Sequence, residues 1–111
     1  MTQTEAFALT LLIEAPVALL LGRLFRVSLS GCALSAIIGS SLTHPILWAV
    51  FHDVQPLLGA LTTPVLEAAV FLAEAPVYRM LAARRWDDAL LLSLLVNAVS
   101  WAAGEVIYVM T

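Results

Sequence analysis

The chain has 111 residues, of which 62% are hydrophobic and 12% are charged, and its formal net charge is −3. A soluble domain carries roughly 25% charged residues, so the composition excludes an ordinary soluble domain and predicts a single integral membrane domain over residues 1–111. The one cysteine, Cys32, excludes an intramolecular disulfide and a zinc site built from several cysteines. We expect the lipid bilayer as a partner and no nucleic acid.

Four stretches are long enough to cross a bilayer, which takes about 20 helical residues. In chain order they run from about Glu5 to Gly22, Leu29 to Phe51, Leu58 to Ala82 and Asp88 to Met110. The short connections favour antiparallel neighbours in a compact bundle. The sequence therefore predicts an all-α integral membrane protein with four transmembrane helices.

The first stretch holds a glutamate, Glu14, inside the apolar run "LLIEAPVALLLGR". An ionisable group at the bilayer centre costs about 2.5–3.5 kcal/mol, so Glu14 should face other polar groups or a water-filled cavity. We do not expect this stretch to be a cleaved signal peptide, because no positively charged segment precedes it.

The other three stretches also carry polar side chains at helical spacing. The second has Ser40, Ser41, Thr43 and His44, the third has Glu67 and Glu74, and the fourth has Asn97, Ser100 and Glu105. Residues three, four or seven apart share one face of a helix, so each helix should present one polar stripe. A bundle this small cannot hide four carboxylates separately, and we expect the stripes to meet on its axis.

The arginines predict the orientation in the membrane. All five lie in or beside two connections: Arg23, Arg26, Arg79, Arg84 and Arg85. The positive-inside rule places both connections in the cytoplasm. The two termini and the segment from Phe51 to Gly59, predicted to be a loop, would then lie on the periplasmic side of a cell inner membrane.

The tetrapeptide "EAPV" occurs twice, at Glu14 to Val17 and at Glu74 to Val77. One interpretation is an internal duplication with halves of about 5–52 and 58–110. Each half would be a helical hairpin, and the two tandem hairpins would be related by a pseudo-two-fold axis along the membrane normal. The other interpretation is a chance match in a chain rich in Ala, Val and Pro.

Depth separates the polar residues into two layers, counted from the arginine connections at 1.5 Å per residue. Glu14, Glu74 and Asn97 lie near mid-membrane, with Ser100 close to the same stripe. Two close carboxylates rarely ionise together, so this layer predicts an ion or proton relay.

The second layer lies roughly 10 Å further toward the predicted outer face and consists of His44, Glu67 and Glu105. One histidine and two carboxylates from three helices form a candidate site for a divalent, zinc-like or iron-like metal ion. Two simpler interpretations stay open: a neutral His44 hydrogen-bonded to a glutamate, and a Glu105 solvated at the interface. Without the metal we expect no cofactor.

In size, in the number of expected spans and in the position of Glu14, the chain resembles the small multidrug resistance transporters. Only Glu14 carries this resemblance. Proteins of that family have one such carboxylate and a third span containing Trp and Gly, whereas the third stretch here reads "TTPVLEAAVFLAEAPVYRM". Glu67, Glu74 and His44 also depart from the pattern, and the family is not assigned.

Three functions remain compatible with these residues. The first is binding or transport of a cation, either a metal ion or a proton coupled to a substrate. The second is a metal-dependent, membrane-embedded enzyme that uses His44, Glu67 and Glu105. The third is a small structural subunit whose glutamates pair with the helices of a larger membrane complex. A homo-oligomer is expected if a polar face stays exposed in one copy.

Overall fold

The computed structural model describes residues 2–110, which are almost entirely helical. The helices are α1 (Gln3–Leu24), α2 (Leu29–Leu58), α3 (Thr62–Leu81) and α4 (Trp86–Met110), and a short 3-10 helix, η1 (Gly59–Leu61), lies between α2 and α3. The predicted all-α class is confirmed.

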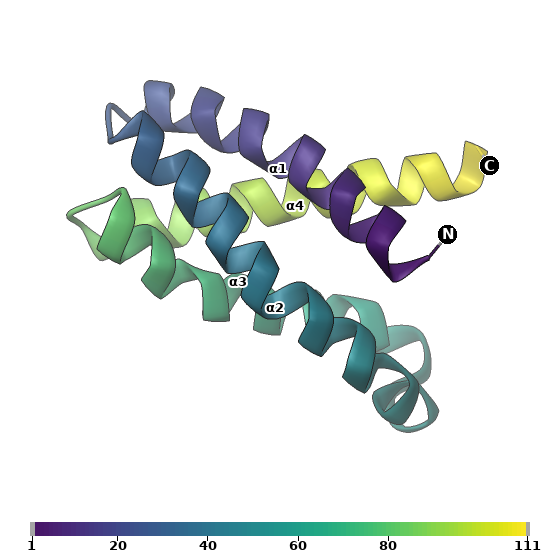
Figure 1. Ribbon diagram of the computed structural model, residues 1–111. Coiled ribbons are helices and arrows are strands. Elements are labelled where there is room, and N and C mark those ends of the chain that lie inside the picture. The colour runs from purple at the N-terminus through teal and green to yellow at the C-terminus, as the bar shows by residue number, and fades with distance from the viewer. Residues whose placement is uncertain (1, 111) are drawn as a thin grey trace.

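The number of separate membrane-length segments differs from the prediction. In the described chain three continuous helical segments are long and apolar enough to cross a membrane: Gln3–Leu24, Leu29–Leu81 and Trp86–Met110. The middle segment has 53 residues because η1 follows α2 directly and α3 follows η1 directly, although the chain turns back between α2 and α3 (Figure 1). The prediction of four separate spans, with a loop from Phe51 to Gly59, is therefore wrong at this point.

The polar residues that suggested this loop belong to the last turns of α2, which continues to Leu58. The helix ends at Gly59, whose φ of 57° lies in the left-handed region that glycine adopts at low cost. The terminating signal is thus the glycine and not the polar side chains of His52 and Asp53.

The four α-helices form a ring in which α1 and α3 each pack against both α2 and α4. Residues 25–28 connect α1 to α2, and residues 82–85 connect α3 to α4; both connections lie at one end of the bundle (Figure 1). We call this the Arg end, because all five arginines lie in these connections or in the last turns of α1 and α3. The beginning of α1, the end of α4 and η1 lie at the opposite end, the far end (Figure 1).

The bundle is packed near the Arg end and open near the far end. Figure 1 shows α1 and α4 diverging from α2 and α3 toward the far end. Burial follows this divergence. Within the described residues, burial in α1 begins at Glu14, burial in α2 ends at His44 and burial in α4 ends at Asn97.

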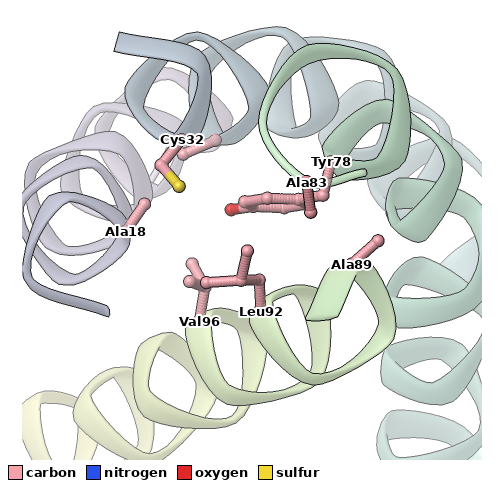
Figure 2. Packing of buried hydrophobic residues seen from close by; sticks show 8 residues of the cluster. Ala18, Cys32, Tyr78, Ala83, Ala89, Leu92 and Val96 are labelled. Carbon is pink, nitrogen blue, oxygen red and sulfur yellow. The ribbon is translucent and has the colours of Figure 1, made fainter. Parts of the chain in front are cut away.

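Small side chains allow the close packing near the Arg end. The buried cluster consists of Ala18, Cys32, Ala36, Tyr78, Ala83, Ala89, Leu92 and Val96 (Figure 2). A Cβ added at Gly31 would overlap the carbonyl oxygen of Leu81. Glycine at this position therefore lets the backbones of α2 and α3 approach closely, as small residues do between membrane helices.

The helices also fit a membrane by length and by surface. With 22 residues α1 is about 33 Å long at 1.5 Å per residue, and the hydrocarbon core of a bilayer is about 30 Å thick. Large apolar side chains cover the outside of the bundle, among them Leu12, Leu20 and Leu24. Such a surface suits lipid.

Candidate functional site

One polar cavity, of about 230 Å³, lies where the packed half meets the open half. We call it the vestibule. Its polar and aromatic lining comes from all four helices: Thr10, Glu14, Ser40, Thr43, His44, Thr63, Glu67, Glu74, Asn97, Ser100, Trp101 and Glu105. All seven site residues singled out from the sequence are in this set.

The vestibule extends from the packed core toward the far end. Its lining is buried at Glu14 and Glu74, half-buried at Glu67 and exposed at Glu105. Access therefore comes from the far end, while the small-residue cluster closes the Arg end.

Glu14, near the middle of α1, is only 2% exposed. Its Oε2 accepts a hydrogen bond from the hydroxyl of Ser40 on α2, and its carboxyl also interacts with Ser100 on α4. Donors from two other helices thus hold this carboxyl inside the bundle.

Glu74, on α3, is only 1% exposed. It accepts hydrogen bonds from Thr43 Oγ1 at 2.8 Å and from Asn97 Nδ2 at 3.5 Å. A Cβ added at Gly39 would lie 3.0 Å from both Cγ and Oε1 of Glu74. The missing side chain at Gly39 leaves the room in which the Glu74 carboxyl lies against α2.

The two buried carboxyls share α2 as a source of donors and lack a basic partner. Ser40 donates a hydrogen bond to Glu14, and Thr43, about one turn later on α2, donates one to Glu74. The two carboxyls also interact electrostatically with each other. No arginine lines the vestibule, and the chain has no lysine.

The arginines lie at the Arg end, outside the vestibule. Among residues 2–110 the one ion pair joins Arg85 to Asp87 at 3.0 Å, both exposed at the Arg end. Four carboxylates therefore line one cavity without an arginine or lysine as counter-charge. A proton or a bound cation is what would neutralise such a site, since buried charges are normally paired.

His44 lies among aromatic rings and not against a carboxylate. Its ring centroid is 5.4 Å from that of Phe7 and 6.2 Å from that of Trp48. Its Nδ1 is buried and has no hydrogen-bond partner in the described chain. No hydrogen bond or ion pair joins His44 to a glutamate among residues 2–110.

The three residues of the predicted metal site line the same cavity but do not converge. No group of three or more His, Cys, Asp or Glu within residues 2–110 is placed to hold a metal ion. Glu67 and Glu105 interact electrostatically, and Glu105 accepts a hydrogen bond from Trp101 Nε1 at 3.2 Å. The metal site stays a prediction without geometric support.

Tyr78 is a buried residue with a polar group that was not singled out from the sequence. Tyr78 follows Glu74 by one helical turn, is fully buried, and has a hydroxyl without a hydrogen-bond partner in the described chain. It interacts electrostatically with Glu74, Glu14 and Cys32. The signal was available: the second "EAPV" is followed by Tyr78 where the first is followed by Ala18, and a residue four positions after a glutamate shares its helix face.

Comparison with known proteins gives no match, whether to models of protein families, to curated proteins or to solved structures. The functional conclusion therefore depends on the geometry of the vestibule and on its charges.

Proposed function

We propose that this chain is a membrane protein that binds a small cation, and above all the proton, at Glu14 and Glu74 and carries it across the bilayer. The observation that carries the proposal is the charge of the vestibule: four carboxylates line one cavity, and no arginine or lysine does.

The burial of Glu14 and Glu74 supports a cation as the ligand. Two carboxyl groups that are nearly inaccessible and electrostatically coupled cannot both stay ionised at low cost. Uptake of a proton, or of a monovalent cation shared between them, removes this cost. The site is therefore suited to bind and release one positive charge.

The donors around the two carboxyls support a defined binding geometry. Ser40 and Thr43 hold one carboxyl each, and Asn97 adds a second donor to Glu74. Because Asn97 Nδ2 also donates to the Ser93 carbonyl oxygen at 2.7 Å, its amide is fixed to its own helix. Carboxyl groups held in a fixed orientation would bind and release the cation at one defined position in the cavity.

The one-sided access supports transport rather than passive storage. A carrier binds its cargo from one side and then opens to the other. The vestibule is open toward the far end and closed toward the Arg end, which is the cytoplasmic side in the orientation that the arginines predict. In that orientation this conformation is the outward-open state.

We propose Glu14 and Glu74 as the cation site in preference to His44, Glu67 and Glu105. The latter three do not form a group that could hold a metal ion. A divalent metal ion as cargo is an alternative that the same experiment distinguishes. It would appear as metal influx that is lost in His44→Ala.

The test is ion flux into proteoliposomes. A potassium gradient with valinomycin drives proton uptake, which an enclosed pH-sensitive dye reports, and a metal-sensitive dye reports metal influx in parallel. We expect proton uptake well above that of empty liposomes and a loss of at least tenfold in Glu14→Gln and in Glu74→Gln.

The matched control is Glu5→Gln, the same change on the same helix as Glu14. Glu5 is exposed and belongs to the capping box with Thr2, a role that glutamine also fills. Its flux should equal that of the unchanged protein. Wild-type flux no greater than that of empty liposomes, or full flux in both vestibule variants, would refute the proposal.

A further inference from the structure

We propose that Tyr78 is the inner gate of the vestibule. Its ring closes the route from Glu14 and Glu74 toward the Arg end, and its hydroxyl is the next polar group on that route. The part that concerns conduction rests on the proposed function, whereas the part that concerns closure does not.

Tyr78 occupies the position that a gate requires. It lies one turn beyond Glu74 on α3, on the side of the Arg end, and its side chain has no solvent exposure. Figure 2 shows its ring extending from α3 into the middle of the bundle, with Leu92 and Val96 of α4 on one side and the hydroxyl end toward Cys32 of α2.

The closure depends on this one ring. The other members of the buried cluster are aliphatic side chains or cysteine, and four of them are alanines. Ala18, at the position on α1 that corresponds to Tyr78 after the first "EAPV", leaves room for the ring. Removal of the ring would leave only alanines, Cys32, Leu92 and Val96 in the cluster between the vestibule and the Arg half.

The hydroxyl is unusual among the buried hydroxyls of this half. Ser93 donates to the Phe71 carbonyl oxygen at 2.7 Å and Ser35 donates to the Gly31 carbonyl oxygen at 2.6 Å. The Tyr78 hydroxyl is equally buried but has no partner within residues 2–110. Buried hydroxyls are nearly always paired, so this one is free to bond a passing water molecule or cation.

The titratable groups that interact with Tyr78 agree with a place for its hydroxyl on the route. Tyr78 interacts electrostatically with Glu74, Glu14 and Cys32. Two of these are the carboxyls at the base of the vestibule, and the third lies in the packed half. The hydroxyl is thus the polar atom between the proposed binding site and the closed end.

Closure can be tested with the native thiol, because Cys32 is the only cysteine of the chain and is fully buried in the cluster around Tyr78. A water-soluble, cationic methanethiosulfonate reagent suits the acidic vestibule. In the reconstituted protein we expect slow modification of Cys32, at least tenfold faster modification in Tyr78→Ala, and a wild-type rate in Tyr78→Phe, which keeps the ring.

Leu92→Ala is the control for general loosening of the core. Leu92 is also fully buried, but it lies on α4 closer to the Arg end than Val96. Its truncation should leave the modification rate within about threefold of wild type. Equal rates in Tyr78→Ala and Leu92→Ala, or no acceleration in Tyr78→Ala, would overturn the assignment of Tyr78 as the closing element.

The role of the hydroxyl is tested by proton flux in Tyr78→Phe. We expect at least a tenfold loss while Cys32 stays protected, and unchanged flux in the control Tyr108→Phe, since the Tyr108 side chain is 79% exposed. Wild-type flux in Tyr78→Phe would reject the conduction role. If the unchanged protein conducts no protons, the proposed function fails, while the thiol experiment still decides whether Tyr78 closes the vestibule.

Discussion

The two halves of this bundle are built from the same helices but differ in what those helices present to the interior. Near the Arg end the interior is a cluster of small and aliphatic side chains around Tyr78. Near the far end it is the polar vestibule. At the border, burial begins or ends on a polar residue in three helices: Glu14 in α1, His44 in α2 and Asn97 in α4.

From this difference we expect that the residues important for stability and the residues important for transport lie at different positions along the bundle axis. The packed half supplies buried contacts that hold the four helices together. The border supplies charges that are costly to bury, and the open half supplies access to them. Substitutions in the packed half should therefore change the free energy of unfolding, and substitutions at the border should change flux.

The largest expected effect on the free energy of unfolding comes from truncating a buried leucine in the packed half, compared with an exposed leucine in the open half. Leu92→Ala should lower the free energy of unfolding by about 2–5 kcal/mol, because Leu92 is fully buried and its truncation leaves a cavity. Leu12→Ala should change it by less than about 0.5 kcal/mol, because Leu12 is 73% exposed. Unfolding in mixed detergent micelles measures both, and equal losses would contradict the division into two halves.

The next largest effect on stability is expected from replacing a glycine by alanine in the packed half, compared with the same change in the open half. Gly31→Ala should cost about 1–3 kcal/mol, because the new methyl group meets the backbone of Leu81, which cannot rotate away. At Gly104, in the open half, a Cβ meets nothing within 4 Å. Gly104→Ala should therefore gain up to about 1 kcal/mol from helix propensity. Thermal unfolding of the two variants should shift in opposite directions.

A smaller effect is expected at the border. Thr43→Val removes the hydroxyl that donates to Glu74 and should cost about 0.5–1.5 kcal/mol. Ser41→Ala is the control on the same helix, since Ser41 is exposed and donates only to the Ile37 carbonyl oxygen of its own helix. Proton flux should fall in Thr43→Val and stay unchanged in Ser41→Ala. Equal flux in both would show that the Thr43 hydroxyl does not orient Glu74.

The smallest change in stability should accompany Gly39→Ala. Its methyl group would press on the Glu74 side chain, which is flexible and can move, so the cost should nearly cancel the gain in helix propensity of about 1 kcal/mol. The Glu74 carboxyl would, however, be displaced from Asn97. We therefore expect unfolding within about 1 kcal/mol of wild type together with reduced flux. Unchanged flux would show that the position of this carboxyl against α2 does not matter.

Much of the helical structure could be predicted from the sequence, because membrane-length apolar runs and three- or four-residue spacing are local signals. They placed Glu14, Glu74 and Asn97 on stripes that now line one cavity. They failed for Phe51 to Gly59, where polar residues suggested a loop although a helix can extend with solvated side chains until a glycine ends it. Duplication and membrane orientation stay predictions.

The rest could not be predicted because it depends on packing between helices. Spacing placed His44 near two glutamates in depth, but the divergence of α1 and α4 from α2 and α3 is not encoded in any one helix. In the folded bundle His44 of α2 lies beside Phe7 of α1 and Trp48 of its own helix, which depends on how α1 packs against α2. The spacing could have shown that Tyr78 shares the helix face of Glu74, but not that small residues on other helices surround its ring.

The three-residue connection between α2 and α3 has a consequence for biosynthesis. With only Gly59–Leu61 between them, the two helices bring almost no hydrophilic loop that must be moved through the hydrocarbon layer. They can therefore enter a bilayer together as one helical hairpin. His52 and Asp53 are then the main polar side chains near its tip that must cross the hydrocarbon layer. In the orientation that the arginines predict, the arginine-bearing connections would stay on the side of synthesis, and this hairpin could set the final orientation before α4 has left the ribosome.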